Sequence, residues 1–246
     1  MIKIITLVTK FIVVAFIALL FHSCNIKTDF GNGEKGNAKI TTEVRNIKED
    51  FSSIDVNSGI EVVIEQSSDK FLSIETDSNL LKLIDTKVVD GVLHIEPNKI
   101  YSTTNGVKVV IRMQKIESLE ASSGSTIKGK NSFKGENISI DTSSAAEVDV
   151  NLQYDNVKLD VSSGSKIHSK GIALKLDTSA SSGGEIEALE LLVNQVVASV
   201  SSGASIGVHP IVDLDADASS GGRITYNIEP KSISKDESSG GSIGRE

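Results

Sequence analysis

Serines are the residues of this sequence whose type and spacing could do chemistry. They recur in the motif Ser-Ser-Gly-x-x-aliphatic, for example in LDVSSGSKIH at residues 159–168. A serine nucleophile needs a base within hydrogen-bonding reach and an acid that orients this base. Of His94, His168 and His209, only His168 is expected near a motif serine, and it should point outward. A hydroxyl that recurs along the chain suits a structural ladder better than one active site, so we predict no catalytic residue and no enzyme.

The motif returns at a nearly constant spacing, which indicates a repeat protein. Its copies begin at residues 122, 143, 162, 181, 201, 219 and 238, and a relative, NSGIEV, begins at Asn57. Around each copy, apolar residues alternate with polar ones, which is the period of a strand. Two short strands per repeat, stacked on identical neighbours, predict an all-β fold. It is a single-chain parallel, right-handed β-helix, or β-solenoid, with coils of about 19–21 residues.

The repeat is less regular toward the N-terminus and decays at the C-terminus. Residues 57–122 hold no clean copy, which fits either wider coils with longer loops or a small β lobe continuous with the solenoid. In the last copy, Lys235 and Glu237 occupy columns that hold apolar residues elsewhere. We expect this final coil to be a charged cap that faces water and discourages edge-to-edge pairing.

The motif itself predicts a sharp corner. Extending the alternation through it places the second serine on the inward side, followed by glycine, which allows φ values denied to other residues. A buried hydroxyl there is expected to bond to corner backbone or to the serine of the next coil. The predicted structural corner serines are Ser123, Ser144, Ser163, Ser182, Ser202 and Ser220.

The first residues predict export. Lys3 and Lys10 precede an apolar run over residues 11–21, and Cys24 follows it. A basic start, a short apolar segment and a small residue before the cut describe a secretory signal peptide, here residues 1–23. The run is shorter than the roughly 20 residues that a membrane span needs.

Cys24 resembles the lipobox cysteine of bacterial lipoproteins, which is acylated and becomes the new N-terminus. The other interpretation is a plain secretory signal with an incidental cysteine. The resemblance implies lipidation of Cys24 and an outer-membrane location, lipid-anchored, on the periplasmic or cell-surface face. The predicted domains are then the signal peptide, a lipid-anchored flexible tether over residues 24–40, and the solenoid over residues 41–246. Within the solenoid we expect irregular coils over residues 41–118 and regular coils over residues 119–246.

A column of acidic residues stands two positions before the motif and invites a metal-binding interpretation. Asp141, Asp160 and Asp217 are the candidate ligands, because Ca²⁺ takes roughly six to eight oxygen ligands. Like charges at the ladder spacing repel by only about 0.8 kcal/mol in water, so a solvated stripe without metal is the other interpretation. We expect the solvated stripe, with no metal and no cofactor.

The composition limits the partners. The formal net charge of −8 disfavours binding to nucleic acid. Aromatic residues make up 4% of the chain and Trp is missing, whereas carbohydrate-active β-helix enzymes use aromatic platforms for sugar rings. A single cysteine permits no internal disulfide.

Several segments together resemble a known family. FSSIDVNSGIEVVIEQ (51–66), GVLHIEP (91–97), VKVVIRM (107–113) and the Ser-Ser-Gly repeats are similar to the bacterial "putative auto-transporter adhesin, head GIN domain" family. The resemblance covers roughly residues 40–246 and implies a Bacteroidetes-type envelope protein. The family offers no catalytic motif, so no site residue is carried over.

These observations favour a non-catalytic cell-envelope lipoprotein that is an adhesin-like binding module. It would be held at the membrane by its N-terminal lipid and would present its β-helix faces to a macromolecular partner, protein or glycan. The alternatives are a carbohydrate-active β-helix enzyme, a lyase or hydrolase, and a purely structural envelope component. The sequence leaves the oligomeric state open.

Overall fold

Each regular repeat forms one long strand, because apolar and polar side chains alternate along almost its whole length. The structure, a computed structural model, describes residues 33–246, so the predicted signal peptide and Cys24 lie outside the described residues. The long strands are β11 (Thr126–Thr142), β12 (Glu147–Val161), β13 (Lys166–Ala180), β14 (Glu185–Val200) and β15 (Ser205–Ala218). We expected two short strands per coil. The strand pairing instead continues around the bend, with register shifts such as the one between Lys128 and Ser132.

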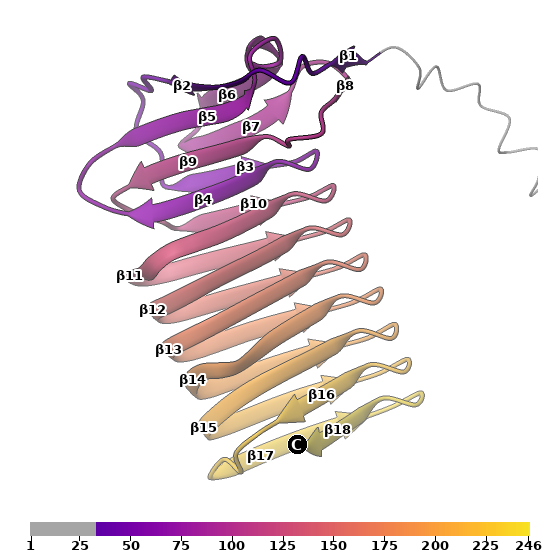
Figure 1. Cartoon of the computed structure of the whole chain (residues 1–246). Coiled ribbons are helices and arrows are strands. Elements are labelled where there is room, and N and C mark those ends of the chain that lie inside the picture. Colours follow the sequence, from indigo (N-terminus) through magenta and orange to yellow (C-terminus); the bar gives the residue numbers. More distant parts are fainter. Residues whose placement is uncertain (1–32) are drawn as a thin grey trace, which may run out of the picture. The chain divides into compact units, whose positions relative to one another are not determined.

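Successive coils stack in parallel and in register. The aliphatic residue after each turn pairs with its counterpart in the next coil, from Ile127 with Val148 to Ile224 with Ile243. The last coils add β16 (Arg223–Tyr226), β17 (Ser232–Glu237) and β18 (Ser242–Arg245). About seven parallel, stacked coils confirm the predicted β-solenoid (Figure 1).

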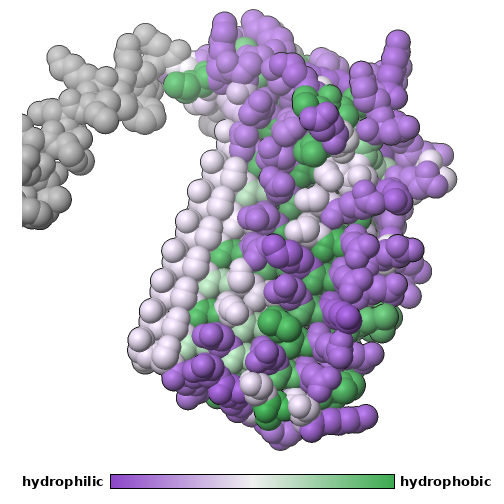
Figure 2. All heavy atoms as spheres, turned by 180° about the vertical axis from the view of Figure 1, so that it is seen from behind, coloured by the Kyte–Doolittle hydropathy of each residue, from purple (hydrophilic) through white to green (hydrophobic). Residues whose placement is uncertain are grey.

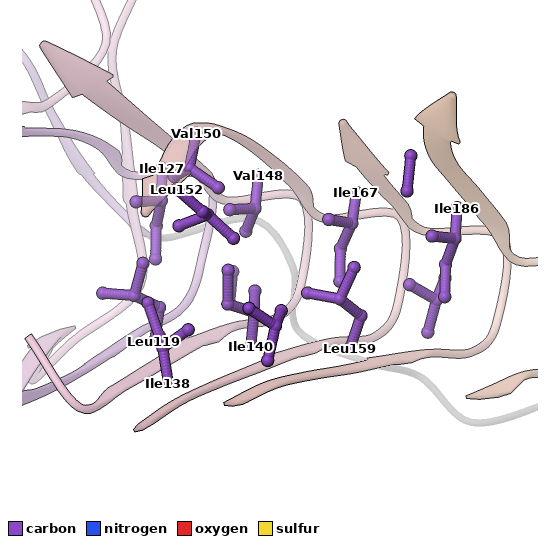
Figure 3. Packing of buried hydrophobic residues seen from close by; sticks show 14 of the residues in the cluster. Leu119, Ile127, Ile138, Ile140, Val148, Val150, Leu152, Leu159, Ile167 and Ile186 are labelled. Carbon is purple, nitrogen blue, oxygen red and sulfur yellow. The ribbon is translucent and has the colours of Figure 1, made fainter. Parts of the chain in front are cut away.

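Each coil has two arms that enclose a slender core. In the coil of β13, the leading arm follows the Ser-Ser-Gly turn (residues 166–170) and the trailing arm precedes the next turn (residues 175–180). We call the bend between the arms the far corner, here residues 171–174. Figure 3 shows Ile167 of a leading arm above Leu159 of a trailing arm, and one cluster of buried residues continues through all the coils. This cluster contains nearly all the buried apolar residues of the described part.

The N-terminal part is continuous with the solenoid, but its coils are stacked out of chain order. The chain forms a first coil from β3 (Ser53–Val56) and β4 (Glu61–Gln66), and later a second from β7 (Val92–Pro97) and β9 (Lys108–Met113). The second coil pairs with the outer edge of the first, and β10 (Ser118–Ala121) then returns to the inner edge. Neither interpretation of residues 57–122 anticipated this exchange.

Antiparallel strands end the stack beyond this outermost coil. β5 (Phe71–Asp77) pairs with β9, β6 (Ile84–Val89) with β7, and β2 (Ile40–Val44) with β5. A 3₁₀ turn (Leu81–Leu83) lies between β5 and β6. Antiparallel pairing stops the parallel ladder, so further coils cannot add at this end without displacing these strands.

Residues 34–40 belong to this folded end, which corrects the predicted tether of residues 24–40. β1 (Glu34–Lys35) pairs in parallel with β8 (Tyr101–Ser102). The backbone N–H of Ala38 donates to the buried carboxylate of Asp77 at 2.5 Å, and Asn37 N donates to Asn79 Oδ1 at 3.0 Å. The polar, glycine-rich composition of this segment concealed the hydrogen bonds that hold it. No helix among residues 33–246 is long and apolar enough to cross a membrane.

The last coil is the charged cap that its sequence predicts. Lys235 and Glu237 lie in β17 with exposed side chains, although their columns are buried in earlier coils. The Lys235 ammonium lies 4.8 Å from the ring centroid of Tyr226 and donates a 2.8 Å hydrogen bond to its hydroxyl. The open end of the core is therefore covered by an amphipathic side chain.

Candidate functional site

The Ser-Ser-Gly motifs form tight turns along one edge of the solenoid. In each turn the fourth residue donates to the carbonyl of the first, for example Ser165 N to Ser162 O at 3.2 Å. The two central residues have positive φ, 54° at Ser163 and 69° at Gly164, as in type I′ turns. Gly164 N also donates to Ser182 O of the next coil at 3.2 Å. The turns therefore form a hydrogen-bonded ladder of their own, which Figure 2 shows as a pale ridge.

The predicted inward orientation of the second serine is wrong. The six serines have positive φ and exposed side chains: Ser123, Ser144, Ser163, Ser182, Ser202 and Ser220. Alternation by two holds only for extended residues, and two successive left-handed residues turn both side chains outward. The buried hydroxyl comes two residues later. Ser125 Oγ donates to Val56 O at 3.1 Å, and Ser165 Oγ to Thr142 O at 2.8 Å.

The histidines near the regular coils are held by the strands. His168 Nδ1 lies 3.1 Å from Asp149 Oδ1 in the neighbouring coil, and His209 Nδ1 lies 3.2 Å from the carbonyl oxygen of Leu189. Within residues 33–246, no hydrogen bond joins a histidine to a turn serine. Both rings are thus oriented by their own strand ladders rather than by the turns.

The outward side of the trailing arms is acidic, and we call it the acidic face. Its main column holds Asp55, Glu120, Asp141, Asp160, Asp217 and Asp236. Burial, reinforced by the neighbouring carboxylates, raises the pKa of Glu120 and of Asp141 above the usual values. In the described part of the chain, no group of three or more His, Cys, Asp or Glu side chains is arranged to hold a metal ion. Four of these carboxylates, from Asp55 to Asp160, are stacked on successive coils, whereas Ser179 and Ser199 separate them from Asp217. At the two ends of this stack, His94 Nδ1 lies 3.0 Å from Asp55 Oδ2 and Lys158 Nζ lies 2.7 Å from Asp160 Oδ2.

Asp141→Asn is expected to stabilise the protein at neutral pH. Because the pKa of Asp141 is raised in the folded protein, its ionised form destabilises the fold at any pH above that pKa. Repulsion by one directly stacked carboxylate contributes on the order of 1 kcal/mol in water. Below the pKa of an aspartate in the unfolded chain, about 4, Asp141 is protonated in both the folded and the unfolded protein, and the advantage of the amide disappears. Melting curves of both proteins near pH 7 and near pH 3.5 measure this difference.

Asp215→Asn is the matched control for this prediction. Asp215 lies in the neighbouring outward column, where its ladder partners are Val197 and Ser234, so its removal relieves no directly paired carboxylate. Equal stabilisation by the two substitutions at neutral pH would contradict the repulsion that we assign to the main column.

The outward side of the leading arms is charged but largely self-neutralising. Lys166 Nζ lies 2.7 Å from Glu187 Oε1 and 3.5 Å from Glu185 Oε2. Lys128 Nζ lies 3.5 Å from Glu61 Oε1 of the adjacent coil. The two faces of the solenoid therefore differ in electrostatic character. The leading arms pair opposite charges between coils, whereas the acidic face stacks Glu120 and Asp141 between other carboxylates and pairs only the ends of this stack, Asp55 and Asp160, with basic groups.

The far corner carries a groove made of two adjoining clefts, of about 870 Å³ and 490 Å³. The larger cleft has mainly polar walls, which include Gln66 and Lys115. The smaller cleft is lined by Tyr154, Ile172, Leu174, Leu192 and Ile211 among others. Lys134 and Gly135 line both clefts and form their junction. We call the two together the corner groove.

Comparison with known proteins decides the family. The profile of the family "Putative auto-transporter adhesin, head GIN domain" matches residues 50–230, which is most of the solenoid. The chain belongs to this family. The resemblance seen in the sequence is thereby confirmed. No curated protein matches the chain.

Solved structures show that this head GIN domain chain shares its fold with proteins from Bacteroides and Parabacteroides. A "putative adhesin" from Bacteroides fragilis matches with a TM-score of 0.80 and 21% identity, over 87% of this chain and 100% of that one. A "putative lipid binding protein" from Parabacteroides distasonis has a TM-score of 0.73 and 22% identity over 87% and 100% of the two chains. A "putative adhesin" from Parabacteroides merdae has a TM-score of 0.72 and 22% identity, over 87% of this chain and 99% of that one. At these identities the matches establish the fold alone.

Sequence analysis missed the corner groove of this head GIN domain. A signal was present, because Ile172 and Leu192 are ladder partners in a column that holds Lys134 and Gln153 in the preceding coils. Aliphatic residues at an outward position in consecutive coils depart from the polar pattern of that column. The signal lies at the far corner, where a repeat defined on the opposite turn aligns least well.

Proposed function

We propose that this head GIN domain protein is a non-catalytic lipoprotein of the cell envelope, and that its acidic face binds basic groups on a partner protein. The observation that carries the proposal is the uninterrupted stack of Asp55, Glu120, Asp141 and Asp160 on successive coils. Within residues 33–246, Glu120 and Asp141 make no ion pair. A partner's Lys or Arg residues would relieve the repulsion in this stack, which supports the acidic face over the self-neutralising one.

The proposed attachment follows from the sequence. Lipidation of Cys24 would anchor the protein in the outer membrane, with the solenoid on the periplasmic or cell-surface side. Incorporation of labelled palmitate into the full chain, and its loss in Cys24→Ala, would support the anchor. Protease treatment of whole cells then distinguishes the surface from the periplasm. Equal labelling of both proteins would overturn the proposed anchor.

Charge reversal on one face tests the proposed binding. Cells that display the chain are applied to immobilised extracellular-matrix proteins and, separately, to a glycan array. We expect protein binding that is abolished in Glu120→Lys/Asp141→Lys, because the reversal turns attraction into repulsion. The control, Asp149→Lys/Glu187→Lys, makes the same change in charge on the leading arms and should bind as the parent does. Binding to glycans alone, or equal loss in both variants, would contradict the proposal.

A further inference from the structure

We propose that the corner groove binds a free fatty acid, a site distinct from the acidic face and beyond the adhesin-like function. Its apolar cleft is lined by Ile172, Leu192 and Ile211, which come from three successive coils and are 49%, 42% and 38% exposed. Leu174, 51% exposed, lies beside them. Single exposed aliphatic residues are common, but a contiguous set that lines a cleft is typical of a binding site.

The apolar cleft is elongated along the solenoid axis. Its lining passes from Tyr154 through Ile172 and Leu192 to Ile211, one coil at a time. Three coil spacings span roughly 14 Å at the usual distance between paired strands. A cleft that extends over several coils and is lined by aliphatic side chains matches an extended hydrocarbon chain better than a compact ring system.

The direction of the cleft favours a hydrocarbon chain over a peptide. It runs across the strands, so a peptide that lay along it could not add to the sheet as a further strand. A peptide in this orientation would bury its own backbone polar groups against aliphatic side chains without partners, which is costly. A methylene chain has no polar group to satisfy along its length.

Lys134 places a positive charge where the apolar cleft meets the polar one. Its backbone is fixed by Gln66, whose Oε1 accepts from Lys134 N at 2.7 Å and whose Nε2 donates to Lys134 O at 2.9 Å. Lys115, in the polar cleft, is paired with Glu117 at 2.8 Å, whereas Lys134 has no ion pair within the described residues. The Lys134 ammonium is therefore free to bind the carboxylate of a fatty acid.

Gly135 keeps this junction open. A Cβ atom at Gly135 would lie 2.6 Å from Cε1 of Tyr154, too close for any side chain without displacing the ring. The ring cannot move easily, because the Tyr154 hydroxyl donates a 2.8 Å hydrogen bond to the carbonyl of Ile116 inside the fold. Asp155 and Glu136 also line the groove, so the carboxylate should sit beside Lys134 and not farther along.

Displacement of a dansyl-labelled undecanoic acid tests the proposal. A chain of residues 33–246 suffices, because solved relatives that match 87% of this chain over 99–100% of their own length form the same fold alone. We expect unlabelled laurate to displace the probe and dodecylamine, with the same chain and a positive head, to compete about tenfold less well. Failure of laurate to displace the probe up to its solubility limit, or equal competition by the amine, would overturn the proposal.

Two substitutions locate the site, with a matched control. Leu192→Asp should weaken laurate binding about tenfold or more, and Lys134→Glu should weaken laurate but not dodecylamine. Val197→Asp lies in the same strand at a similar exposure, 49%, but outside the groove, and should leave binding unchanged. Equal effects of Leu192→Asp and Val197→Asp would contradict the groove as the site.

A membrane surface is the competing occupant. Sedimentation with phosphatidylethanolamine–phosphatidylglycerol vesicles should leave the protein in solution, since the groove is proposed to hold a free fatty acid. Sedimentation that Leu192→Asp abolishes would show that the groove serves a lipid bilayer, and would overturn the proposal.

Discussion

Ile167→Asp is expected to abolish folding of the regular coils. Ile167 is 0% exposed, at the middle of a ladder that joins Val148 and Ile186. The substitution removes the buried aliphatic surface and places a carboxylate in an interior where no cation faces it. We expect a loss of more than about 5 kcal/mol, comparable with the entire stability of many domains. Soluble yield and the far-UV melting curve measure the effect.

Ile172→Asp provides the control within the same strand. Ile172 lies five positions further along β13 but is 49% exposed, so a carboxylate there remains hydrated. We expect a change in stability within about 0.5 kcal/mol. If both variants fold equally well, the aliphatic ladder that we describe is not what holds the coils together.

The alternation of residue types was sufficient to predict this core. Each inward column repeats the same class of residue at a nearly constant spacing, and a strand can bury such a column only by stacking in register. The same argument identified the exposed positions of Lys235 and Glu237. It could not reveal the exchanged order of the coils formed by β3–β4 and β7–β9, because strand pairing across long separations leaves no trace in local periodicity.

The turn serines show where the period-two argument ends. It gave the correct burial for the aliphatic residue of the repeat, Ile167, but the wrong burial for Ser163, which is the first of the two central residues of the turn. The glycine at 164 was the local sign of positive φ, and a second left-handed residue before it completes a type I′ turn. A serine there is uncommon, so the sequence alone favoured the extended conformation.

The two candidate sites also differ in whether local periodicity could predict them. The acidic face was visible as a column in the sequence, because its residues keep one position in most of the repeats, with Ser179 and Ser199 as the exceptions. The corner groove was not, because Lys134, Tyr154 and Ile211 come together only through the far corner, where register shifts move the columns. Ligand-binding positions placed at such irregularities require coordinates to be recognised.

Gly171→Ala is expected to destabilise the solenoid strongly, although it adds only one methyl group. Gly171 has a φ of +117°, and an added Cβ would lie 2.0 Å from the carbonyl oxygen of Leu152. Leu152 is the ladder partner of Gly171 in the preceding coil, so this oxygen cannot retreat without breaking the β12–β13 pairing. We expect a loss of about 3 kcal/mol or more from strain and disrupted pairing together.

Gly164→Ala separates backbone strain from the steric clash. Gly164, in the turn of the same coil, also has positive φ, +69°, but an added Cβ would meet nothing within 4 Å. The left-handed conformation alone costs an alanine roughly 1–2 kcal/mol. Urea unfolding of the two variants should therefore show a clearly larger loss for Gly171→Ala. Equal losses of stability would contradict this prediction. They would mean that the backbone of β12 and β13 at the far corner can move apart with little loss of free energy.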